Sequence, residues 1–358
     1  MSELRSILGG AHIIYSYMSS KLLFHGDLPI IINDTLRDRE LVSIGIVVNC
    51  GSVTEDPRIN GASHFLEHLV FKGTESYSAK DISRIVEECG GYINAYTSKE
   101  QTAYYIRGFS RNVDKFLSVL MELVFFPELS DKEFDQEREV IINEIKSIKD
   151  NPEEYLMEVT EEEVFKGTQL EFPISGTAQS VSRITLDDLK DYHVKRYNPS
   201  DCALVLSGNI DEKAVLKQLE SYDIPKANKN GHIKTDNVFH TVKRDINMET
   251  EQVYSNILFP AMDIIDDRRY ELLALNFAVG GLMSSRLFQR VREDLGLCYS
   301  IESDISLYRD NGYLSIFFNS MQSSYKEVLD VIAEECDKVK LNGLTQKELE
   351  TAKNQLRF

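Results

Sequence analysis

The order of elements along this chain repeats, and that repetition constrains the fold more than any other feature. A polar stretch at residues 225–234 has no apolar periodicity and separates two halves. Each half begins with a strand, continues through helices to two alternating strands, and ends in further helices. The segment Leu129-Ser-Asp-Lys-Glu-Phe is similar to Leu344-Thr-Gln-Lys-Glu-Leu, 215 positions later. We therefore predict an α+β fold of two duplicated domains, each an antiparallel-rich sheet covered by helices.

Local signals place the elements of each half. Ser78 with Asp81 resembles a capping box, and Gly90-Gly91 stops the helix that follows it. In the first half we predict strands at 41–50, 92–97, 102–108 and 203–207, with helices at 79–89, 113–124 and 130–150. In the second half we predict strands at 252–259, 298–303 and 312–319, with helices at 268–279, 285–294, 325–339 and from 345 onward. The predicted domains are residues 1–225 and 237–358, joined by a linker at 226–236.

The second half has no counterpart for the last part of the first. The 215-residue offset maps Phe358 onto Asn143, and the first half continues from there to its closing strand. We expect the second domain to be incomplete at its C-terminal end, either because a longer protein is truncated or because a partner chain completes it. A sheet without its closing strand would expose an edge.

Composition excludes several classes of function. The chain has 358 residues, 42% of them hydrophobic and 27% charged, which suits two globular domains. No apolar run approaches the ~20 residues of a membrane span, and the first residues make a poor secretory signal, so we expect a cytoplasmic protein without membrane contact. Five scattered cysteines indicate reduced, mostly buried thiols. A net charge of −18 argues against nucleic acid; it could attract basic peptides or simply keep the protein soluble.

The segment His64-Phe-Leu-Glu-His68 contains the residues that indicate a catalytic metal site. Residues four apart on a helix lie on one face, so His64 and His68 can bind one metal ion. Glu67 stands beside them and can move a proton of a metal-activated water, which favours hydrolysis with Zn²⁺. A third ligand is best sought on the helix at 130–150. There Glu137 and Glu144 are two turns apart on one face, and we expect Val140, Ile141 and Ile145 to pack into the core.

The combined motifs resemble the M16 family of zinc metallopeptidases, the pitrilysins or inverzincins. The likeness is strongest to the M16B branch, which holds mitochondrial processing peptidases and bacterial relatives. The family motif is HxxEH followed by a glutamate about 76 positions later, and Glu144 stands 76 positions after His68. Further similar stretches lie at residues 51–56, 61–74, 90–98, 174–177 and 284–300, the last containing Arg292 and Tyr299 seven positions apart.

The resemblance implies a metalloprotease LuxS/MPP-like fold and a role for each matched residue. His64, His68 and Glu144 would bind Zn²⁺ while Glu137 supports the site, and Glu67 would act as general base. Asn94 and Ala95, on the strand at 92–97, would contact an extended peptide substrate. Arg292 and Tyr299, from the second domain, would hold the substrate carbonyl or stabilise the oxyanion.

Two functions remain open at this point. The first is an endopeptidase that acts on small or unfolded peptides, with leader- or presequence-like peptides as candidates. The second is a non-catalytic subunit that binds peptides or scaffolds an M16-type assembly. Such subunits typically lose part of HxxEH or of the Arg/Tyr pair, and this chain keeps both, which favours the peptidase. Because one chain carries both parts, we expect a homodimer, or a partner chain that completes the second domain.

Overall fold

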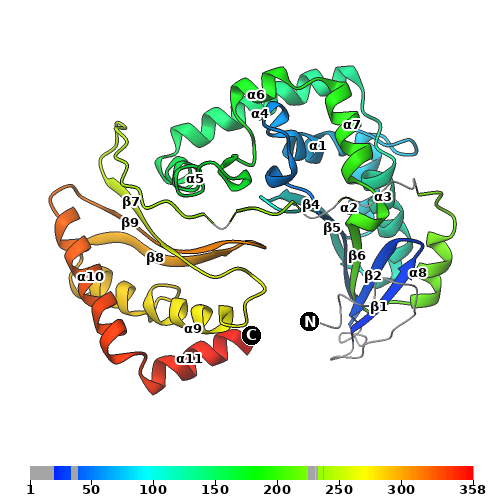
Figure 1. Ribbon diagram of the computed structural model, residues 1–358. Coiled ribbons are helices and arrows are strands. Elements are labelled where there is room, and N and C mark those ends of the chain that lie inside the picture. The colour runs from blue at the N-terminus through cyan, green and yellow to red at the C-terminus, as the bar shows by residue number, and fades with distance from the viewer. Residues whose placement is uncertain (1–19, 34–38, 225–229, 231–232, 237, 358) are drawn as a thin grey trace. The chain divides into compact units, whose positions relative to one another are not determined.

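The computed structural model describes residues 20–33, 39–224, 230, 233–236 and 238–357. Its residue contacts divide the chain into two compact units, both drawn in Figure 1. The first unit contains the described residues up to Ile145 and those from Phe172 to Ile233. The second contains Lys146–Glu171 and the described residues from Lys234 onward.

The first unit is built on a six-stranded sheet with the strand order β1-β2-β6-β3-β5-β4. All neighbouring strands are antiparallel except β2 and β6, which run parallel. Side chains of β3 and β6 alternate between buried and partly exposed, as expected for a sheet with one covered face. The strands are β1 Ser20–His25, β2 Leu28–Asn33, β3 Leu41–Val48, β4 Tyr92–Thr97, β5 Thr102–Phe109 and β6 Cys202–Gly208.

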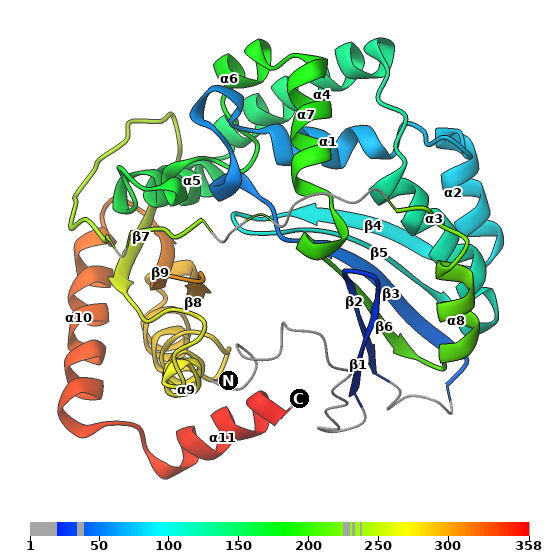
Figure 2. The same cartoon turned by 45° about the vertical axis from the view of Figure 1, so that its right-hand side comes forward.

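Helices of the first unit bury one continuous core against that covered face. Figure 2 shows α2, α3 and α8 lying along the sheet. Ser78 and Asp81 form the predicted capping box at the start of α2. The helices are α1 Ala62–Val70, α2 Ala79–Glu88, α3 Val113–Phe125, α4 Asp131–Asp150, α6 Ala178–Arg183, α7 Leu186–Arg196 and α8 Glu212–Leu219.

The second unit repeats the central part of this topology. Its strands are ordered β7-β9-β8, which matches β3-β5-β4 of the first unit strand for strand, and both pairings are antiparallel. Its elements are α5 Pro152–Val164, β7 Val253–Pro260, α9 Arg269–Val279, a π-helix at Phe288–Asp294, β8 Cys298–Leu307, β9 Gly312–Ser320, α10 Tyr325–Asn342 and α11 Gln346–Arg357. The predicted α+β class and its two-domain duplication are confirmed.

Helix α5 belongs to the second unit although it precedes the predicted linker. Tyr308 and Tyr313 both donate to one carboxylate oxygen of Glu161, the second at 2.7 Å. The ring of Phe165, which follows the helix, lies 5.7 Å and 6.0 Å from those of the two tyrosines. The predicted domain bounds at 225 and 237 remain a prediction, and most of the 226–236 linker lies outside the described residues.

Other expectations differ in detail or stay open. The strand predicted at 298–303 continues to Leu307, and the helix predicted at 285–294 is π-wound over Phe288–Asp294. Three of the five cysteines are buried and all five are free thiols. Within the described residues, no helix is both long and apolar enough to cross a bilayer. The C-terminal incompleteness of the second domain remains a prediction.

Candidate metal centre

The start of α1 is fixed by a carboxylate from outside the helix. Glu55 is 3% exposed and accepts hydrogen bonds from the backbone nitrogens of Gly61 and Ser63, both at 2.7 Å. Asn60 Nδ2 donates to the same carboxylate at 2.9 Å. Burial raises the pKa of Glu55 to about 7, while these three donors act to lower it. The carboxylate satisfies first-turn amides that a helix leaves without partners, so it sets where α1 begins.

The segment at residues 174–177 packs against this helix start. Gly61 has φ +99°, and a Cβ there would lie 2.8 Å from the Ser175 carbonyl oxygen. Gly176 has φ +72°, and a Cβ there would collide with the Asn60 carbonyl group. Two glycines therefore allow two backbone segments to touch at the base of α1.

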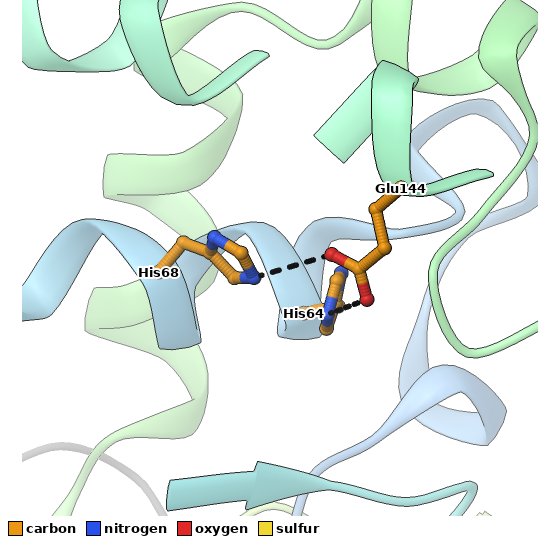
Figure 3. A group of neighbouring side chains, drawn as sticks. All are labelled: His64, His68 and Glu144. Carbon is orange, nitrogen blue, oxygen red and sulfur yellow. Dashed lines mark ion pairs between the residues drawn. The ribbon is translucent and has the colours of Figure 1, made fainter. Parts of the chain in front are cut away.

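His64, His68 and Glu144 come together as predicted. Each offers one potential ligand atom, and these atoms all lie within 4.8 Å of one another. His64 Nε2 lies 3.6 Å from Glu144 Oε1, and His68 Nε2 lies 3.7 Å from Glu144 Oε2. Figure 3 shows both imidazoles, from α1, facing the carboxylate that descends from α4. Of the neighbouring α4 residues, Ile141 and Ile145 are buried as expected, whereas Val140 is 48% exposed and does not join the core.

The chemistry of this group suits a metal cation. Burial, and then the nearby His68, lower the pKa of His64 to about 4, so its ring is neutral at pH 7 and keeps a lone pair. Two imidazole nitrogens and one carboxylate are a ligand set that catalytic zinc sites use, with a fourth position left for water or substrate. The side chains present therefore fit a zinc ion.

Glu137 lies behind His68, on the side away from Glu144. Its side chain is buried, and its Oε2 atom lies 3.1 Å from His68 Nδ1. Its other oxygen, Oε1, lies 2.7 Å from Lys72 Nζ. Sequence reasoning expected the support from Glu137 but missed Lys72. Lys72 stands four positions after His68, but α1 ends at Val70, so helical spacing gave no signal for it.

Glu67 lies on the same turn of α1 as His68, and a residue of the sheet holds its side chain in place. Thr97 Oγ1, at the end of β4, donates to Glu67 Oε2 at 2.5 Å. Burial raises the pKa of Glu67 above its ordinary carboxyl value, against the lowering effect of that hydrogen bond. A carboxylate with a raised pKa is a better proton acceptor near neutral pH, as a general base requires. Thr97 was not among the predicted site residues.

Asn94 and Ala95 lie on β4, an edge strand of the first unit. Among the described residues β4 pairs only with β5, where Asn94 is opposite Tyr105 and Ala95 opposite Tyr104. Asn94 is exposed, and its Nδ2 donates to the Tyr92 hydroxyl at 2.6 Å. The strand thus has an unpaired edge among the described residues, and it ends at Thr97, the residue hydrogen-bonded to Glu67.

Arg292 and Tyr299 are close together within the second unit. The Arg292 guanidinium carbon lies 5.7 Å from the centre of the Tyr299 ring and 4.6 Å from that of Phe288. Arg292 lies in the π-helix, a conformation often found at functional sites, and Tyr299 is 75% exposed. Their predicted role toward a substrate remains a prediction.

Together these features define a metallopeptidase-type centre, in which a general-base carboxylate lies beside a three-residue metal group. The family model described as insulinase, peptidase family M16, matches residues 32–178. A second model, described as the peptidase M16 inactive domain, matches residues 183–356. The chain belongs to peptidase family M16.

Named relatives and solved structures agree with this assignment. The chain is 36% identical to YmxG of Bacillus subtilis, an uncharacterized zinc protease, over 91% of this chain and 79% of that protein. It is 32% identical to an uncharacterized zinc protease of Streptomyces coelicolor, over 91% of this chain and 73% of the relative. A solved protease from Helicobacter pylori has the same fold, with a TM-score of 0.86 at 20% identity over 95% of this chain and 84% of that one. The predicted family and enzyme class, a metallopeptidase, are confirmed.

Proposed function

We propose that the chain is a zinc-dependent endopeptidase that cleaves small or unfolded peptides, with leader- or presequence-like peptides as the natural class. The observation that carries the proposal is the placement of Glu67 beside His64, His68 and Glu144. The names of the relatives, which are zinc proteases, support zinc as the metal. His64, His68 and Glu144 would hold it. When bound, zinc supplies a Lewis acid and a water whose pKa is lowered to ~7.

The residues of the chain would divide the remaining work. Glu67 would take the proton of the attacking water, and Thr97, which donates to its Oε2, would hold the carboxylate in place. Glu67 then returns that proton to the leaving amine. An extended substrate adds to the free edge of β4, so main-chain hydrogen bonds near Asn94 and Ala95 bind peptides with little dependence on sequence. Arg292 and Tyr299 complete the proposal as donors toward the substrate carbonyl.

The proposal extends to the setting of the enzyme. We place it in the cytoplasm and expect a homodimer, or a partner chain that completes the second domain. The support is the presence of the metal motif and of the Arg/Tyr pair in one chain, since the heterodimers of this family usually divide them between partners. Gel filtration of the purified chain at the size of a monomer would count against the dimer.

Cleavage of an unstructured peptide mixture, followed by mass spectrometry, tests the proposed activity. The zinc-loaded wild type is compared with Glu67→Gln and with Glu139→Gln, which makes the same change at an exposed position of α4. We expect products from the wild type and Glu139→Gln, and a rate roughly 10²- to 10⁴-fold lower for Glu67→Gln. All three proteins should bind zinc. A wild type that binds zinc yet yields no products would contradict the peptidase and favour a non-catalytic peptide-binding subunit.

A further inference from the structure

One buried carboxylate joins a metal-facing histidine to a lysine. Glu137 is 6% exposed, and its two oxygens have different partners. Oε2 lies 3.1 Å from His68 Nδ1, and Oε1 lies 2.7 Å from Lys72 Nζ. His68 is on the last turn of α1, and Lys72 follows the helix in a turn where its backbone nitrogen donates to the Leu69 carbonyl oxygen at 2.9 Å. Ammonium, carboxylate and imidazole therefore form a continuous chain of contacts.

A carboxylate this deeply buried requires a positive partner. Transfer of an unpaired carboxylate out of water costs several kcal/mol, and one hydrogen bond from a neutral imidazole does not offset that cost. Among the described residues, the ion pairs of Glu137 are those with His68 and Lys72. Lys72 carries the formal positive charge, and its side chain is 32% exposed, so the ammonium keeps partial hydration while it binds Oε1.

The carboxylate in turn decides which nitrogen of His68 faces the metal group. A neutral imidazole has one N–H donor and one lone-pair acceptor. With Glu137 Oε2 against Nδ1, the hydrogen belongs on Nδ1, and the lone pair remains on Nε2, which faces Glu144. His64 has no equivalent support within the described residues, where its buried Nδ1 has no hydrogen-bond partner. Outer carboxylates of this kind fix the tautomer and ring orientation of ligating histidines.

We propose that Lys72 is a positioning residue of the metal centre: it binds Oε1 of Glu137 and so holds Oε2 against His68 Nδ1. The inference rests on the proposed zinc site. Among the described residues, the ion pair of Lys72 is with Glu137, so Lys72 acts on His68 through that carboxylate. Its loss frees the carboxylate to rotate away from His68, and the ring of His68 then loses its fixed orientation and its single tautomer.

Zinc affinity, measured by competition with a chromophoric chelator, tests the proposal without any peptide. Lys72→Met should weaken zinc binding by about 10- to 100-fold, the range seen when outer partners of metal ligands are removed. Lys72→Arg keeps a cation within reach of Oε1 and should recover most of that loss. Lys132→Met is the matched control, because Lys132 is an exposed lysine paired with Glu133. It should bind zinc as the wild type does.

Two further measurements separate positioning from a general structural effect. In a Glu137→Gln background, Lys72→Met should cause little additional loss, because the two residues act through one contact. In the zinc-free protein, ¹⁵N spectra of the histidine rings should show His68 as the Nδ1–H tautomer in the wild type and as a mixture in Lys72→Met. These spectra remain informative if Lys72→Met is less stable or if the wild type fails to cleave peptides.

The proposal is overturned if Lys72→Met binds zinc as tightly as the wild type with an unchanged His68 spectrum. It is equally overturned if Lys72→Met weakens zinc binding as much in the Glu137→Gln background as alone. A wild type that binds no zinc would instead remove the proposed function, and the tautomer of His68 would still report on Lys72.

Discussion

The two units share the order of three strands, yet in the part of the chain that the structure describes the metal group lies in the first unit alone. In the first unit, α1 follows β3 and carries His64, Glu67 and His68. In the second, α9 follows β7 and buries small or neutral residues, among them Ala274 and Ala278. Asn276 of α9 is also buried, and its Oδ1 accepts from Ser303 Oγ at 2.5 Å. The same scaffold position thus holds a reactive group in one unit and a satisfied core contact in the other.

The following long helix shows the same contrast. Glu137, buried on α4, maps by the 215-residue offset onto Ala352 of α11, which is fully buried. A carboxylate in the first unit is therefore replaced by a methyl group in the second. A buried carboxylate needs charged and hydrogen-bonding partners, and an alanine needs none. The duplicated architecture therefore places the helices, whereas a few polar residues, each with its own partners, create the metal centre.

The largest expected effect concerns Arg292 of the second unit. If Arg292 acts on the substrate as proposed, Arg292→Ala should lower kcat for peptide cleavage by about 10²- to 10³-fold, the effect of losing one oxyanion donor. Zinc content should not change, because the proposed ligands all belong to the first unit. Arg290→Ala, in the same π-helix, is the control and should keep its activity. Loss of zinc from Arg292→Ala, or an unchanged kcat, would contradict this division of roles.

Two glycines, one in each unit, allow the stability of the two units to be compared. Gly176 and Gly296 both have positive φ, +72° and +61°, but only Gly176 lies against other backbone, next to Asn60 and Gly61. Gly296→Ala should cost about 1–2 kcal/mol of unfolding free energy for its backbone conformation alone. Gly176→Ala should cost at least about 3 kcal/mol, since the steric overlap adds to that strain. It should also weaken zinc binding by displacing the start of α1.

Denaturant unfolding of the two variants measures the difference. No heavy atom of the described residues lies within 4 Å of a Cβ built at Gly296, so this variant measures the conformational cost without the overlap. Equal losses of stability in both variants would show that the close approach at the base of α1 is unimportant.

The last expected effect concerns the loss of stability at acid pH. His193, on α7 of the first unit, lies with Nε2 2.9 Å from the Val124 carbonyl oxygen, and burial lowers its pKa from 6.5 to about 4. Below pH 6.5 the unfolded chain binds a proton that the folded chain does not. The unfolding free energy should therefore fall as pH drops toward 4, by about 3 kcal/mol from this residue. His193 lies in the first unit, so this loss of stability belongs to that unit.

Unfolding of the metal-free protein at several pH values between 7 and 4 checks this expectation. His193→Gln retains a donor for the Val124 carbonyl group but does not titrate, so its stability should fall less with acid than that of the wild type. If the unfolding free energies of the two proteins change equally with pH, protonation of His193 does not affect stability.

Much of the fold and of the centre was predictable because local rules govern it. Helical spacing brings His64 and His68 to one face, and alternation defines β4 over the same residues in sequence and structure. The missed features depend on partners that periodicity does not identify. The roles of Lys72 and Thr97 depend on contacts between elements distant in sequence. Glu55 is near in sequence to the amides that it caps, but it comes from outside the helix, where the usual capping pattern does not look for it. Likewise, the apolar face of α5 can be recognised in the sequence, but the sequence does not show which of the two units this helix packs against.

The central claim, that the first unit holds the catalytic metal, is tested most directly by metal analysis after zinc loading and exhaustive dialysis. We predict about one zinc ion per chain in the wild type and almost none in His64→Ala, with His193→Gln retaining its zinc. A wild type without bound zinc, or a His64→Ala variant that keeps a full equivalent, would contradict the account.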